Sequence, residues 1–432
     1  MPAAISSAHR ETLDRLLNEI VASKSTPAAL FGVTNAEGPI YLHAEGTKLI
    51  DDPSSDAIDE DTVFWLCSQT KMITTIAALQ LVDQGKITLD TPVETIIPEL
   101  ANPVIVTAHD EAGHIKTTVP ATGKITLSQL LNHTSGLDYA LDGTFPKIGP
   151  GFGMPIAYSH HYKEGEGVSK FFEIIKGSLP GVPLRFEPGT NFAYGFSSDC
   201  AGYVVERLSG KPLEQYLQDH VFAPLGITSM SFSLTPKLKE RLLPLSYRPK
   251  TGVIERWNGP DVLEQDRANG NNGIPRRSRT IRIIEGLPHN LASSSSDFSA
   301  SNPILSHASV DSMFTPTLPA AGADTVGMLV SFMQPHIGFP TGSAQFSYGL
   351  CVNTEDILGK RKKGTGCCKS FPSASYFTSF AGGGWASTTF WVDRATGVAA
   401  VFGTQLAPTG DVIFDAKLDV LERALYAGLN CS

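Results

Sequence analysis

The sequence predicts an α/β sandwich, in which helices flank one antiparallel sheet and a mostly helical lobe is inserted beside it. Short β-rich runs lie near both ends of the 432-residue chain, and a helical pattern comes first and last. The middle is rich in Pro and Gly and has only short helical segments. We therefore expect residues 1–90 and 290–432 to build the sheet domain, and residues 91–289 to form the helical lobe.

The N-terminal elements follow from hydrophobic spacing. Residues 8–22 carry Leu and Ile three and four positions apart, which predicts an amphipathic helix. The runs 28–35 and 39–46 predict two strands joined by a hairpin turn. A long apolar helix then begins near Ser68 and ends at Gly85, a residue type that favours the left-handed conformation at helix ends.

The remaining elements are shorter. Periodicity and β-branched or aromatic content predict helices at 127–131, 168–176, 200–208 and 414–427, and strands at 346–353, 388–393 and 398–405.

The charge balance excludes several kinds of partner. Lys and Arg number 34 and Asp and Glu 43, so the net charge is −9, which argues against nucleic acids and anionic membrane surfaces. No run reaches the roughly 18 apolar residues of a membrane helix. The N-terminus does not resemble a secretory signal, so we expect a cytoplasmic protein with reduced cysteines. The basic run 360–363 is expected to be a solvated loop.

The tetrapeptide Ser68-Gln69-Thr70-Lys71 is a candidate nucleophile and its activating group. Positions i and i+3 share one helical face, so the Lys71 amine can reach the Ser68 hydroxyl and activate it. Free N–H groups at a helix start also favour an oxyanion. To act as a base, Lys71 must be neutral part of the time, and burial would lower its pKa. On these residues alone, a Ser helix cap with a solvated Lys remains the alternative.

Other catalytic patterns are missing from the sequence. It contains no G-x-S-x-G, no H-E-x-x-H and no C-x-x-C, and its Gly382-Gly383-Gly384 is not followed by the Lys-Ser or Lys-Thr of a phosphate loop. We expect neither a metal nor a cofactor.

Five further motifs, together with Ser68 and Lys71, carry a family resemblance. The chain resembles the serine β-lactamase-like superfamily, and within it the class C β-lactamase-type (family VIII) esterases and the fungal transesterases of the lovastatin acyltransferase type. The motifs are DQGKITLD at 83–90, LLNHTSGL at 130–137, EPGT at 187–190, VVERLSG at 204–210 and PLGI at 224–227.

The resemblance implies a serine β-lactamase-like fold and a three-residue catalytic site. Tyr194 corresponds to the family's catalytic tyrosine, and a phenol beside the Lys71 cation is favoured as the phenolate. Whether Lys71 or Tyr194 is the general base stays open. The oxyanion hole is expected from the backbone N–H groups of Ser68 and Trp385. His133 lies in a family turn, so a structural role is expected for it.

Two departures from the β-lactamases bear on the substrate. Phe196 stands where they place an Asn that binds a side-chain amide, and Gly382, Gly383 and Gly384 stand where they place Lys-Thr-Gly. The four residues are candidate substrate-binding positions that disfavour β-lactams. A literal Lys-Thr-Gly at 250–252 is expected to be a hairpin turn.

The expected function is therefore a serine hydrolase of the carboxylesterase type, acting on a small-molecule ester through a Ser68 acyl-enzyme. The alternative is an acyltransferase of secondary metabolism that passes the acyl group to an alcohol. A catalytically silent binding protein of the same fold is the third possibility. The sequence predicts no oligomeric state.

Overall fold

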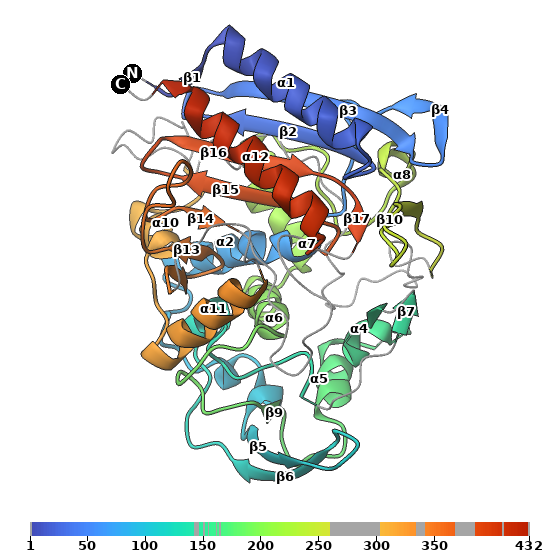
Figure 1. The fold of residues 1–432 in the computed structure, drawn as a ribbon. Coiled ribbons are helices and arrows are strands. Elements are labelled where there is room, and N and C mark those ends of the chain that lie inside the picture. Colours follow the sequence, from blue (N-terminus) through green and yellow to red (C-terminus); the bar gives the residue numbers. More distant parts are fainter. Residues whose placement is uncertain are drawn as a thin grey trace.

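The computed structural model describes residues 2–141, 147–149, 152–153, 155–160, 162–163, 166–259, 303–333, 342–367, 385–407 and 410–430 (Figure 1). Its centre is an eight-stranded antiparallel sheet with helices on both faces, which confirms the predicted α/β sandwich. In spatial order the strands are β12 (Ala344–Phe346), β13 (Cys351–Asn353), β14 (Gly366–Cys367), β15 (Thr389–Asp393), β16 (Val398–Gly403), β2 (Ala28–Thr34), β3 (Pro39–Leu49) and β4 (Asp52–Ala57).

The central strands β2 and β16 are buried along their whole length, because both faces of the sheet are covered. Successive side chains of a strand point to opposite faces. On one face, Phe31 packs against helices α1 (Ser7–Ala22) and α12 (Val412–Gly428), which lie side by side (Figure 1). On the other face, Leu30 shares a core with α2 (Thr70–Asp83). The sheet thus separates two hydrophobic layers, and α2, which carries the candidate lysine, lies in one of them.

Local sequence explains how the first elements begin and turn. The Ser6 hydroxyl caps α1 by accepting the His9 N–H, which satisfies one of the free donors at the helix start. In the predicted hairpin turn, the Asn35 side chain accepts the N–H groups of Glu37 and Gly38 at 2.7 and 3.0 Å. The helix and hairpin predicted there are both present.

A second group of elements lies beside the sheet, and α6 (Ser197–Ser209) packs against α2 (Figure 1). The predicted short helices occur as α3 (Leu127–Leu131) and α5 (Val168–Lys176), and α6 begins three residues before the predicted position 200. A small sheet of β5 (Val104–His109), β6 (Ile115–Pro120) and β9 (Pro183–Leu184) lies at the outer edge.

The remaining described elements are short, with the exception of the 14-residue helix α11. They are β1 (Ala4–Ile5), β18 (Leu429–Asn430), β7 (Lys147–Gly149), β8 (Phe152–Gly153), α4 (Ile156–Ser159), α7 (Leu213–Leu217), α8 (Pro236–Arg241), α10 (His307–Phe314), α11 (Ala320–Met333), β10 (Ser246–Tyr247), β11 (Glu255–Arg256), β17 (Leu406–Ala407), and the short helical turns η1 (Cys67–Gln69), η2 (Val93–Thr95), η3 (Pro98–Leu100), η4 (Gln218–Phe222) and η5 (Ala223–Leu225).

Part of the predicted helical lobe pairs with the C-terminal part of the chain. β10 pairs in parallel with β17, so residues 246–247 lie beside the C-terminal part of the chain. β10 also pairs with β11, and residues 250–252 form the turn between them, as predicted for the literal Lys-Thr-Gly. The predicted boundary at 289 and 290 falls outside the described residues.

The single strand predicted at 346–353 is wrong: β12 and β13 form a tight antiparallel hairpin instead. The Ser347 N–H donates to the Leu350 carbonyl at 2.9 Å, which closes the turn. Gly349 has a φ of 76°, and a Cβ there would lie 2.6 Å from the Thr75 hydroxyl of α2. A glycine is therefore required at this turn, and its close approach to α2 was invisible in the local β pattern.

The solvated loop predicted at 360–363 is wrong for its first two residues. Lys360 and Arg361 are only 3% and 5% exposed. Arg361 donates two hydrogen bonds to Glu422 of α12, at 2.6 and 2.9 Å, and its guanidinium lies 4.7 Å from the Trp391 ring centroid. Lys360 pairs with Glu422 at 3.2 Å. Buried cations need such partners, and these come from a helix about 60 residues later, which local composition cannot reveal.

Among the described residues, no helix is long and apolar enough to cross a membrane.

Candidate active site

Ser68 lies at the start of the buried helix α2, after a sharp change in backbone direction. Cys67 has a φ of 52°, a left-handed conformation that is uncommon for a non-glycine residue. Ser68 follows within the helical turn η1, and Lys71 is in the first turn of α2. The Lys71 ammonium donates to the Ser68 hydroxyl at 3.1 Å. The contact expected from the i and i+3 spacing is therefore present.

The surroundings of Lys71 keep it protonated. Burial lowers its pKa, but the oxygens of Tyr139 and Tyr194, the carboxylate of Asp199 and a hydrogen bond with Tyr194 together raise the pKa above its ordinary value. The Lys71 nitrogen lies 4.8 Å from the Tyr194 ring centroid and 5.9 Å from that of Tyr139. The expectation that burial would make Lys71 neutral is not met, because these oxygens outweigh desolvation.

Tyr194 is buried beside Lys71 and is held there by the motif around His133. The Ala193 N–H donates to the His133 carbonyl at 3.0 Å, and the His133 ring stacks on Tyr194 with centroids 4.7 Å apart. Burial, together with the Lys71 charge, lowers the pKa of His133 to about 3. His133 is therefore a neutral ring at physiological pH that packs against the tyrosine.

Trp385 lies against the segment that leads to Ser68. Its ring packs edge-on to Trp65 with centroids 5.5 Å apart, and to Trp257 at 5.6 Å. Trp65, Cys67 and Trp385 belong to one cluster of packed side chains. Gly382, Gly383 and Gly384, predicted to border the substrate, lie outside the described residues.

Phe196 is 5% exposed and packs into an aromatic core. Its ring meets Tyr139 edge-on at 4.8 Å and Phe171 at 5.5 Å. Phe196 and Tyr139 also line a cavity of about 250 Å³ whose wall is mostly aliphatic, formed in part by Leu137, Ile174 and Val182. The ring thus fills space in the core and borders this cavity.

The sequence reasoning missed three residues that extend the site. The Tyr158 hydroxyl lies 2.9 and 2.8 Å from the two carboxylate oxygens of Asp199 and 3.3 Å from the Tyr139 hydroxyl. Tyr139 in turn faces Lys71. These residues come from a loop, from α4 and from α6, and no short motif links them.

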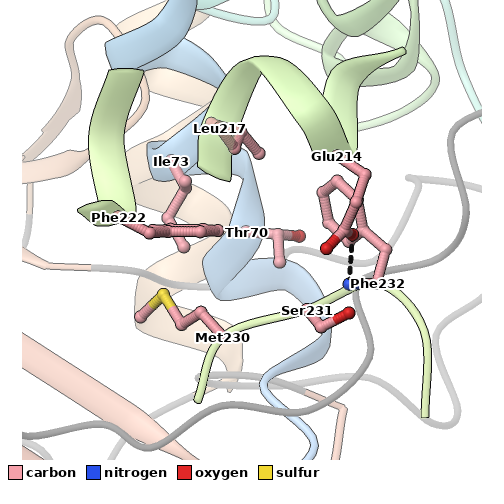
Figure 2. A pocket seen from close by; sticks show the side chains of 8 residues that line it. All are labelled: Thr70, Ile73, Glu214, Leu217, Phe222, Met230, Ser231 and Phe232. Atoms are coloured by element: carbon pink, nitrogen blue, oxygen red, sulfur yellow. Dashed lines mark hydrogen bonds between the residues drawn. The ribbon is translucent and has the colours of Figure 1, made fainter. Parts of the chain in front are cut away.

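A second hollow lies beside α2 and is too small for a substrate. Figure 2 shows Thr70 and Ile73 of α2 facing Glu214, Phe222 and residues 230–232 across it. Its volume of about 10 Å³ suits at most one water molecule. The Glu214 carboxylate accepts the Phe232 N–H at 2.5 Å, which ties the loop to α7 (Figure 2). This hollow therefore does not form part of the site.

Comparisons with known proteins cover nearly the whole chain. The family model described as Beta-lactamase matches residues 13–424. A monacolin J acid methylbutanoyltransferase of Aspergillus terreus is 26% identical, over 96% of this chain and 95% of its own. A lovastatin esterase of Penicillium rubens is 29% identical, over 94% of this chain and 96% of its own. The solved structure of unliganded simvastatin synthase from Aspergillus terreus has a TM-score of 0.75 and 26% identity, covering 98% of this chain and 99% of that one.

Proposed function

Since this chain is an enzyme that belongs to the Beta-lactamase family, we propose that it cleaves carboxylic esters through an acyl intermediate on Ser68. The observation that carries this proposal is the 3.1 Å contact between the Lys71 ammonium and the Ser68 hydroxyl, with Tyr194 beside the lysine. A partly buried serine with an adjacent cation and a phenol nearby is suited to acyl transfer.

The protonation of Lys71 divides the roles between Lys71 and Tyr194. An ammonium group has three donors and no acceptor, so Lys71 cannot take the Ser68 proton. It stabilises the serine oxygen as negative charge develops there, and Tyr194, as phenolate, accepts the proton. We thus assign Tyr194 as the general base and Lys71 as its electrostatic partner.

The reaction then proceeds in two balanced halves. The Ser68 oxygen bonds to the ester carbonyl carbon, and the oxyanion is stabilised by the N–H groups of Ser68 and Trp385. The C–O bond to the alcohol breaks, and Tyr194 returns the proton to the leaving alkoxide. Water or a second alcohol next attacks the acyl-enzyme and gives its proton to Tyr194, which passes the proton to Ser68 as the free serine is restored.

The acyl acceptor distinguishes the leading function from its alternative. A water acceptor makes the protein a carboxylesterase, and an alcohol acceptor makes it an acyltransferase. The relatives include one named as an esterase and one named as a methylbutanoyltransferase. Because both cover nearly the whole chain at similar identity, the shared fold is compatible with either acceptor.

One experiment tests the site and the acceptor together. A fluorophosphonate should label the wild-type protein at Ser68, and Ser68→Ala should not be labelled. Ser54→Ala, which changes an exposed serine of β4, serves as the matched control and should be labelled like the wild type. Labelling of Ser68→Ala at the wild-type rate would refute the assignment. Partition of the acyl group of a p-nitrophenyl ester between water and added alcohols then identifies the acceptor.

A further inference from the structure

A chain of hydroxyl groups connects a carboxylate to the candidate lysine. Asp199 lies in the first turn of α6, where an acidic residue is favoured by the helix dipole. Both of its oxygens are within hydrogen-bond distance of the Tyr158 hydroxyl, and that hydroxyl is 3.3 Å from Tyr139. The Tyr139 ring faces Lys71. Three side chains from separate elements therefore form a line that ends at Lys71.

The proton positions in this chain follow from counting donors. A tyrosine hydroxyl has one proton and can also accept. The bond to the Asp199 carboxylate is the shorter and charge-assisted one, so the Tyr158 proton is directed there. The Tyr158 oxygen also lies 3.3 Å from the Tyr139 oxygen, so the same carboxylate helps to fix both phenols. Lys71 lies over the face of the Tyr139 ring, 5.9 Å from its centroid, and the position of that ring is therefore tied to Asp199.

Few other groups can balance the buried charge of Lys71. Besides Ser68, the titratable groups that face or act on it are Tyr139 from the loop after α3, Tyr194 from the segment before α6, His133 behind Tyr194, and Asp199 of α6. His133 is neutral, and Tyr194 offsets the Lys71 charge only in its phenolate form. Among the described residues, Asp199 is the carboxylate whose charge raises the pKa of Lys71.

We propose that Asp199 is a positioning residue for catalysis, which holds Lys71 in place as a cation through Tyr158 and Tyr139. This inference rests on the proposed function, since it concerns how the Ser68 site is kept ready. Its consequence is measurable: without the Asp199 charge, the Lys71–Tyr194 pair loses its shared proton at lower pH.

The test follows the rate of Ser68 labelling by a fluorophosphonate from pH 5 to 10, so that no natural substrate is needed. The labelling rate should rise with pH as the pair loses its proton. Asp199→Asn keeps an acceptor for Tyr158 but removes the charge. In this variant the rise in labelling rate should occur at a pH about 1 unit lower than in the wild type. Asp199→Glu restores the charge and should bring the rise back toward the wild-type position.

Glu206→Gln is the control above about pH 7, where Glu206 is ionised, because it then removes the same charge from the same helix. Glu206 accepts the Leu213 N–H and takes no part in the Tyr158–Tyr139 chain. Its rising limb should coincide with that of the wild type. If Asp199→Asn fails to fold, Tyr158→Phe replaces it. This variant breaks the hydrogen-bond chain between Asp199 and Tyr139, so its labelling rate should also rise at a lower pH than that of the wild type.

The outcomes separate the two proposals. Wild-type protein that is not labelled at Ser68 would refute the proposed function itself. If Ser68 is labelled normally but the labelling rate of Asp199→Asn or Tyr158→Phe rises at the same pH as in the wild type, or at a higher pH, the role of Asp199 would be overturned. A limb that moves equally in Glu206→Gln would also overturn it, because the effect would then be one of general charge.

Discussion

Glu206 should make the stability of this protein depend on pH, and the size of the effect follows from its surroundings. The residue is 9% exposed and lies in the second half of α6. One carboxylate oxygen accepts the Leu213 N–H at 2.7 Å, while the other has no hydrogen-bond partner among the described residues. Burial therefore raises the pKa of Glu206 from 4.5 to about 7, although the Leu213 bond and Arg207 oppose the rise.

The direction of the pH effect is fixed by which state holds the proton. The folded protein keeps the Glu206 proton up to about pH 7, whereas the unfolded chain releases it near pH 4.5. The stabilising contribution is thus complete below pH 4.5 and is lost as the pH rises to about 7. At about 1.4 kcal/mol for each pH unit, the loss amounts to roughly 3 kcal/mol.

The assay is urea denaturation of wild type and Glu206→Gln across pH 4 to 8. Gln is neutral and keeps an acceptor for the Leu213 N–H, so the two proteins should have similar free energies of unfolding at pH 4. At pH 8 the variant should be more stable by about 3 kcal/mol. Glu11→Gln, at an exposed position of α1, is the control and should run parallel to the wild type. Parallel curves for Glu206→Gln would show that Glu206 is not held protonated by burial.

Three further predictions concern the site and the buried ion pair. Tyr194→Phe should lower kcat for a p-nitrophenyl ester by at least about 10²-fold at an unchanged melting temperature, and near-full activity would exclude it as the base. Arg361→Met should lower the free energy of unfolding in urea by about 3 kcal/mol, because it leaves Glu422 buried with only Lys360 beside it; a loss below about 1 kcal/mol would contradict this account. The kcat/KM for nitrocefin should be at least about 10-fold below that for the ester, since Phe196 offers no amide donor. A preference for nitrocefin would remove the esterase assignment.

Features that depend on neighbouring residues were predictable from the sequence. The Ser68–Lys71 contact follows from an i and i+3 spacing, and the first hairpin from two strand-like runs around an Asn turn. Such features are local, because the residues that decide them lie within one or two turns of chain. Tyr194 was predicted through its resemblance to a family motif, since its partners Lys71 and His133 lie far away in sequence.

The tertiary structure alone decided the properties that depend on charges far apart in the sequence. The protonation of Lys71 depends on Tyr139 and Asp199, and the Tyr158 that links them is 19 and 41 residues from its two partners. The burial of Arg361 likewise depends on Glu422, 61 residues later. A charge is stable in the interior only when an opposite charge or a set of hydrogen bonds is brought beside it. The sequence by itself therefore determined the fold class and pointed to Ser68 as the candidate nucleophile, whereas the ionisation state of the lysine beside it was decided by folding.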